Sequence, residues 1–288
     1  MKERIESLVE AYRGGELDRR AFLTRLIATT GSMAAAHLLL ETSGLASSLV
    51  SEVESRRIDV SSETVTYPGP GGGTLSGYLS APQGAQRHPA VMVIHENRGL
   101  NDHTRDVARR FAAEGFTALA PDILSRKGGT GSMESPDKAR EAIGTIPAEQ
   151  ALADLEAGLA FLDGHARVRR GQLASVGFCW GGARSFLLAA ESKRLKAAVV
   201  FYGSAPPPEK LAEVRVPVLG LYGETDERIT SQVPTVAEAM KKAGKSFDYK
   251  IYPGAAHAFF NDTGERYNAE AAKDAWTRTL AFLRKNLK

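Results

Sequence analysis

The sequence of 288 residues contains one cysteine, so it cannot form an internal disulfide, and a redox role for the thiol would lack a resolving partner. Aromatic residues make up 7% of the chain and are not interleaved with a lysine/arginine stripe, and the net charge is +3. These features give little support to nucleic-acid binding. A zinc motif of the His-Glu-x-x-His type beginning at His95 fails because Gly99 stands where the second histidine would be. We therefore expect no metal and no organic cofactor.

The sequence also lacks an apolar run long enough for a membrane span. The mildly apolar run Leu26–Leu40 covers about 15 residues and contains His37, whereas a helical span needs about 20 apolar residues. It follows Arg19 and Arg20 in the hexapeptide D-R-R-A-F-L, and this pattern resembles a twin-arginine export signal. If the signal is used, cleavage after Ala36 or Ala46 would remove residues up to 36 or up to 46, and the protein is expected to be periplasmic or secreted. Otherwise it is expected to be cytoplasmic.

The alternative for this N-terminal segment is an amphipathic helical hairpin that stays on the mature protein and packs against it or a partner. An oligomer formed through the segment is one such arrangement. The sequence therefore predicts two parts: a helical extension over residues 1–50 and a catalytic domain over residues 58–288.

Residues 58–288 show apolar runs that alternate with helical patterns. A hairpin is expected around the loose turn at 68–73, and residues 126–147 are expected to form a surface loop with a short helix. The alternation predicts an α/β fold: a mostly parallel central sheet with helices on both faces. The expected strands are Val60–Tyr67, Thr74–Ser80, Pro89–His95, Phe116–Ala120, Leu173–Val176, Lys196–Tyr202, Val216–Tyr222 and Asp248–Tyr252, and the expected helices are Met1–Arg13, Thr104–Glu114, Ala148–His165, Ala183–Ala190 and Trp276–Leu287.

The single cysteine, Cys179, lies in the heptapeptide V-G-F-C-W-G-G between an expected strand and an expected helix. This is the sequence form of a nucleophile elbow with cysteine in place of serine. A thiol at a helix N-terminus lies near backbone N–H groups that favour thiolate and oxyanion. The alternative is a buried cysteine in a glycine-containing turn, because free cysteine is among the most buried residue types.

A thiol nucleophile needs a base, and the base needs an acid that orients it. In α/β-hydrolase order the acid and the histidine follow the nucleophile, and His257 is the one histidine after Cys179. The acid should follow the strand that ends at Tyr222. Asp226 is preferred and Glu224 is the second candidate, although either carboxylate could instead cap the next helix.

The strand end at His95 is followed by Glu96, Asn97 and Arg98. In hydrolases this loop supplies one N–H of the oxyanion hole, so we expect the Asn97 N–H to act together with that of Trp180. Glu96 opposes oxyanion formation unless it interacts with the thiol in the resting enzyme. The alternative for Glu96 is a salt bridge with Arg98.

These motifs together resemble the dienelactone hydrolase (carboxymethylenebutenolidase) family of the α/β-hydrolase superfamily. The matching stretches are His95–Asn101, Ala120–Asp122, Asp154–Ala157, Gly177–Gly182, Gly223–Asp226 and His257–Phe259, and the resemblance covers roughly Ile58 to Lys288. It implies a Cys179–His257–Asp226 triad, with Glu96 helping to activate the thiol when substrate arrives.

The resemblance further implies that two arginines bind a substrate carboxylate. Arg126 matches the first, but the neutral Asn261 stands at the position of the second, so we expect weaker recognition of a carboxylated substrate such as dienelactone. The expected function is a cysteine hydrolase of lactones or activated esters that forms a thioester acyl-enzyme. The alternative is a non-catalytic protein of the hydrolase fold that binds a partner through its N-terminal segment.

Overall fold

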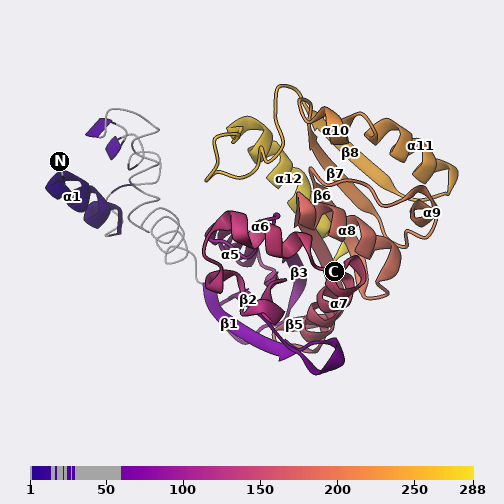
Figure 1. The fold of residues 1–288 in the computed structure, drawn as a ribbon, viewed down its shortest axis with the longest axis horizontal. Helices are drawn as coiled ribbons and strands as arrows, with labels where there is room; N and C mark the ends of the chain where they lie inside the picture. The colour runs from indigo at the N-terminus through magenta and orange to yellow at the C-terminus, as the bar shows by residue number, and fades with distance from the viewer. Residues whose placement is uncertain (1, 14–16, 18–21, 23–24, 27, 30–59) are drawn as a thin grey trace. The chain divides into compact units, whose positions relative to one another are not determined.

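The protein is represented by a computed structural model that describes residues 2–13, 17, 22, 25–26, 28–29 and 60–288. The chain divides into two compact units, Met1–Val60 and Ser61–Lys288 (Figure 1). In the first unit, helix α1 (Lys2–Arg13) is followed by Phe22, whose ring stacks on Tyr12 with centroids 4.5 Å apart. Arg19, Arg20 and most of the Leu26–Leu40 run lie outside the described residues, so the export signal stays a prediction. None of the helices in the described ranges is long and apolar enough to cross a bilayer.

The second unit is built on an eight-stranded sheet. Its strand order is β1-β2-β4-β3-β5-β6-β7-β8. Strand β2 runs antiparallel to β4, and every pairing from β4 through to β8 is parallel. The expected α/β class with a mostly parallel sheet is therefore confirmed. The strands are β1 (Val60–Pro68), β2 (Thr74–Pro82), β3 (His88–Ile94), β4 (Thr117–Asp122), β5 (Val168–Phe178), β6 (Leu195–Phe201), β7 (Val218–Gly223) and β8 (Phe247–Tyr252).

Helices cover both faces of this sheet (Figure 1). Helices α5 (Asp102–Ala113) and α12 (Ala269–Asn286) pack on one face, and α7 (Ala148–Gly164), α8 (Trp180–Glu191) and α11 (Val233–Lys242) pack on the other. Strand β3 shows why a central strand reads as a continuous apolar run. Val91 and Val93 contribute to the cluster under α5, whereas Met92 and Ile94 contribute to the cluster under α7.

Several boundaries differ from those expected. Strand β5 begins at Val168 rather than Leu173, because exposed polar residues extend its edge. Helix α12 begins at Ala269 rather than near Trp276, because the Asn268 side chain caps it by accepting the N–H of Ala271. The expected short helix within 126–147 is α6 (Pro136–Gly144), next to the 3-10 turns Ser125–Lys127 and Thr130–Ser132. The sequence analysis missed α9 (Pro208–Leu211), α10 (Glu227–Thr230) and α11.

Candidate active site

Cys179 occupies a sharp turn between β5 and α8. Its backbone has φ 55° and ψ −113°, in a region that non-glycine residues rarely adopt. Its N–H donates to the carbonyl of Phe201 on the neighbouring strand, at 3.0 Å. Such a conformation costs about 1–3 kcal/mol and persists only where the surrounding structure enforces it. Cys179 therefore sits where the elbow pattern places a nucleophile.

The glycines around Cys179 are required by close backbone contacts. A Cβ atom at Gly177 would overlap the carbonyl of Gly181, and a Cβ atom at Gly181 would overlap the carbonyl of Ile94. At Gly182 a Cβ atom would lie 2.6 Å from the carbonyl oxygen of Phe201. The start of α8 thus packs directly on the ends of β3 and β6, which leaves no room for side chains at these three positions.

His257 lies in the loop after β8 and pairs with a carboxylate from the loop after β7. Its Nδ1 is 2.5 Å from Asp226 Oδ2, and the two side chains are 19% and 9% exposed. Because a carboxylate only accepts hydrogen bonds, Nδ1 carries the proton and Nε2 is left free to act as a base. Glu224 accepts the N–H of Gly254 at 2.8 Å instead. The structure thus brings Asp226, rather than Glu224, to the imidazole.

The Glu96 carboxylate is held from two sides. One oxygen accepts the hydroxyl of Tyr202 at 3.1 Å, and the other accepts the side-chain amide of Asn261 at 3.1 Å. Arg98 lies 3.7 Å from Asp137 on the surface, so the alternative of a Glu96–Arg98 salt bridge is wrong. The neutral Asn261 side chain, at the position where the family resemblance implies an arginine, therefore donates a hydrogen bond to the Glu96 carboxylate.

Tyr202 is a site residue that the sequence analysis missed. It is fully buried at the end of β6, has φ 39°, and its ring centroid lies 5.1 Å from that of His257. Within the described part of the chain, three non-glycine residues have a left-handed φ: Tyr202, Cys179 and Ala258. The three border the same site, since Ala258 follows His257. The one sequence feature that could have indicated the role of Tyr202 is its position before Gly203 at the end of a buried strand.

The thiol of Cys179 has a raised pKa, about 11. Burial is the main cause, and the negative charge of Glu96 is the second. The backbone N–H groups of Trp180 and Asn97 and the charge of Arg228 act in the opposite direction and lower the pKa of the thiol. The expectation that a helix N-terminus favours thiolate is thus outweighed by burial and Glu96. The two predicted oxyanion donors both lie at the sulfur.

Arg126 is engaged by a buried carboxylate. Its Nε and Nη2 donate to the Asp154 oxygens at 2.9 and 2.8 Å, and Nη2 also donates to the carbonyl of Pro70 at 2.7 Å. The Asp154 side chain is only 3% exposed, so this pair is firmly built into the fold. The structure shows Arg126 bracing the turn after β1 against α7. Its role in binding a substrate carboxylate stays a prediction.

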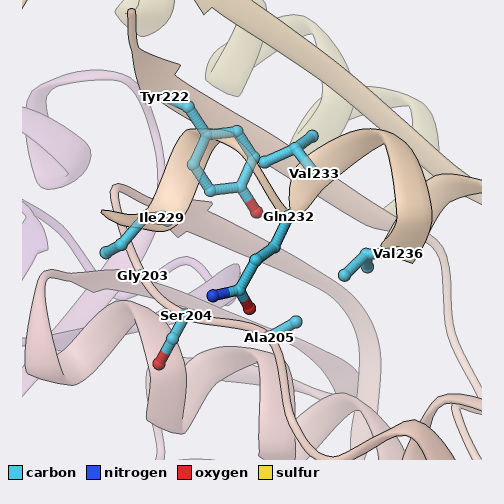
Figure 2. A pocket seen from close by; sticks show the side chains of 8 residues that line it. All are labelled: Gly203, Ser204, Ala205, Tyr222, Ile229, Gln232, Val233 and Val236. Atoms are coloured by element: carbon cyan, nitrogen blue, oxygen red, sulfur yellow. The ribbon is translucent and has the colours of Figure 1, made fainter. Parts of the chain in front are cut away.

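A small pocket lies beyond the ends of β6 and β7 (Figure 2). Its volume of about 10 Å³ suits one water molecule and is too small for a substrate ring. It is lined by Gly203, Ser204, Ala205, Tyr222, Ile229, Gln232, Val233 and Val236. Over the residues that the structure describes, no group of three or more His, Cys, Asp or Glu side chains is placed to hold a metal ion.

Comparisons with known proteins identify the family of the chain. The sequence model of the dienelactone hydrolase family matches residues 75–287. The chain belongs to the dienelactone hydrolase family. It is therefore a hydrolase of that family, with the α/β-hydrolase fold.

Two relatives of the dienelactone hydrolase family carry the name "putative carboxymethylenebutenolidase". The one from Methylorubrum extorquens is 34% identical over 224 residues, which cover 74% of this chain and 77% of the relative. The one from Saccharolobus solfataricus is 35% identical over 247 residues, which cover 74% of this chain and 95% of the relative. The crystal structure of a "putative dienelactone hydrolase" from Klebsiella pneumoniae superimposes with a TM-score of 0.73 at 33% identity, and covers 78% of this chain and 99% of that one.

Neutralising Glu96 is expected to make the thiol more acidic. In Glu96→Gln the negative charge that raises the thiol pKa is gone, so the pKa falls and thiolate is populated at lower pH. A fall of one pKa unit gives about ten times more thiolate at pH 8, and the lower nucleophilicity of the more acidic thiolate reduces this to roughly threefold in alkylation rate. The measurement is iodoacetamide labelling of Cys179 from pH 7 to 10. An unchanged pH profile in the variant would contradict the electrostatic role of Glu96.

Proposed function

We propose that the protein hydrolyses lactones or activated esters with Cys179 as the nucleophile. The observation that carries the proposal is the surroundings of the thiol. Cys179 stands on a strained elbow, and the N–H groups of Trp180 and Asn97 favour its thiolate form. The His257–Asp226 pair lies beside the ring of Tyr202, and the Tyr202 hydroxyl donates to Glu96. Membership of a hydrolase family supports the same chemistry.

In the proposed first half-reaction the thiol of Cys179 attacks the acyl carbonyl. Burial and the Glu96 charge keep the resting thiol neutral. As substrate enters, the thiol proton passes to His257 Nε2, and the negative charge of Glu96 helps by stabilising the imidazolium that forms. The N–H groups of Trp180 and Asn97 then bond the tetrahedral oxyanion. When the C–O bond breaks, the imidazolium gives its proton to the leaving alcohol or enol, and a thioester remains on Cys179.

The second half-reaction releases the acid. A water molecule attacks the thioester carbonyl and gives one proton to His257, whose ring Asp226 orients through Nδ1. The C–S bond breaks, and the imidazolium returns a proton to the sulfur. The site thus regains the neutral thiol that its raised pKa favours.

The chemistry of sulfur points to activated substrates. A thiolate leaves a tetrahedral intermediate more readily than an alkoxide does, so attack on a simple alkyl ester mostly reverses. An enol or phenol leaves more readily, which favours enol lactones and aryl esters. The neutral Asn261 amide faces Glu96, so recognition of a substrate carboxylate at this position lacks a charge-assisted bond.

The expected result in a substrate panel is fast hydrolysis of activated acyl groups. Against dienelactone, p-nitrophenyl acetate, ethyl acetate and lactones matched with and without a carboxylate, kcat/KM should be at least about 100-fold higher for aryl esters and enol lactones than for ethyl acetate. Initial rates are measured beside those of Cys179→Ala. A preference for the carboxylated lactones would support the predicted binding of a substrate carboxylate by Arg126. No preference would be the result expected from the neutral Asn261 at the position of the second arginine. Equal turnover of ethyl acetate would contradict a thiol nucleophile.

A further inference from the structure

The loop that carries His257 and Asn261 is tied to α5 by a buried ionic cluster. Asp262 lies 2.5 Å from Arg110 Nη2 and 3.3 Å from His103 Nδ1. The side chains of Asp262 and His103 are only 4% and 2% exposed. Between β8 and α12 the chain has only turns, so it needs side-chain anchors to hold one conformation.

The α5 side of this cluster is itself fixed. Arg110 also pairs with Asp106 one helical turn earlier, at 2.5 Å. The His103 ring packs edge-on against Phe178 and Phe260, with centroids 6.2 and 6.3 Å away. These contacts hold both partners of Asp262 in place independently of the loop. Breaking one side of a buried ion pair is strongly destabilising, so the anchor is firm.

The anchor reaches the thiol through adjacent residues of the loop. Asn261 precedes Asp262 and donates its side-chain amide to Glu96 at 3.1 Å. Its other side-chain atom accepts the N–H of Thr263 at 3.0 Å, so the amide is oriented with its nitrogen toward Glu96. The charges that shift the thiol pKa are those of Glu96 and Arg228, and the Tyr202 hydroxyl donates to Glu96. His257, the proposed base, is a further titratable side chain at the site.

We propose that Asp262 is a positioning residue: gripped by Arg110 and His103, it fixes the Asn261 amide on Glu96 and so holds that carboxylate beside Cys179. Helix α5 thereby influences the reactivity of the Cys179 thiol, although none of its residues touches the sulfur in the contacts described. The effect on turnover rests on the proposed function, whereas the effect on the thiol does not.

The test measures the thiol rather than turnover. Cys179 is the only cysteine, so the rate of iodoacetamide labelling at pH 8 reports its thiolate directly. Asp262→Asn should free Asn261 and then Glu96, and raise the labelling rate about threefold. Asn261→Ala, which removes no charge, should raise it by a similar factor. The charge-matched control is Asp274→Asn on α12, whose carboxylate bonds Tyr252 and Arg278, and which should leave the rate unchanged.

A double-mutant cycle separates positioning from a direct effect of charge. In a Glu96→Gln background, Asp262→Asn should change the labelling rate by less than half of its wild-type factor, because the carboxylate through which it acts is absent. An undiminished factor in that background, or a single-variant rate equal to that of Asp274→Asn, overturns the proposal. If Asp262→Asn does not fold, Arg110→Lys, which keeps the charge of α5, is measured in its place with the same two readings. Because no substrate is used, an inactive protein would overturn the proposed function and leave this test intact.

Discussion

Replacing Cys179 with alanine is expected to lower kcat/KM for p-nitrophenyl acetate by about 10³-fold or more. The substitution removes the atom proposed to form the thioester, while the proposed oxyanion donors, the N–H groups of Trp180 and Asn97, remain and should leave a residual rate. The side chain is small and partly buried, so the fold should survive its loss. Initial rates of p-nitrophenol release measure the effect, and thermal melting confirms that the variant is folded.

Cys179→Ser sharpens this prediction because it keeps a nucleophilic atom at the same elbow. A serine hydroxyl is far less acidic than a thiol, and the site offers a histidine–aspartate pair placed for sulfur. We expect a loss of about 100-fold with activated esters. Turnover of Cys179→Ala within tenfold of wild type would show that another group is the nucleophile.

Asp226→Asn is expected to lower kcat/KM by about 10²- to 10⁴-fold. The carboxylate at 2.5 Å keeps the proton on His257 Nδ1. In the proposed mechanism it also stabilises the imidazolium that forms during both half-reactions. An amide can present its N–H to the ring instead, which stabilises the wrong tautomer and removes the negative charge. The loss should appear in kcat rather than in KM, because the ring is needed for proton transfer and not for substrate binding.

Glu224→Gln is the matched control for Asp226→Asn. Glu224 stands two residues earlier on the same turn, has the same charge, and bonds the Gly254 N–H rather than His257. We expect its kcat/KM to stay within about threefold of wild type. If the two variants lost activity equally, the Asp226 carboxylate would have no catalytic role distinct from that of Glu224. The hydrogen bond between Asp226 and His257 would then be structural only.

Local sequence patterns were enough to single out the candidate residues whose conformation or order in the chain is set by near neighbours. Cys179 stood out because backbone contacts forbid side chains at Gly177, Gly181 and Gly182, so the elbow leaves a glycine signature. His257 followed from its place in the chain order. Central strands such as β3 were recognisable because burial on both faces makes them continuously apolar.

Residues whose roles depend on distant parts of the chain were not predictable in this way. Tyr202 meets Glu96 across 106 residues, and Asn261 meets it across 165. Asp262 contacts α5 across more than 150 residues, and nothing in the local sequence distinguishes it from an exposed loop aspartate. Arg126 illustrates the opposite case. The family resemblance singled it out as a ligand of a substrate carboxylate, whereas the carboxylate that it contacts in the structure is Asp154 on α7.

The thiol pKa shows why local rules can also mislead. The helix N-terminus near Cys179 does favour thiolate, as expected from the sequence. Burial and the Glu96 charge act in the opposite direction and prevail, and both depend on tertiary packing. The resting thiol is therefore neutral near pH 7, and in the proposed mechanism it becomes reactive when His257 takes its proton.

The central claim, an acyl-enzyme on Cys179, is tested most directly by trapping it. Wild-type protein is mixed with p-nitrophenyl acetate, quenched in acid within the first turnovers and analysed by intact mass and peptide mapping. We predict one acetyl group on the peptide that contains Cys179, appearing before steady-state release of acetate and absent from Cys179→Ala. An acetyl group on any other residue, or turnover with no adduct at Cys179 at any quench time, would contradict the account.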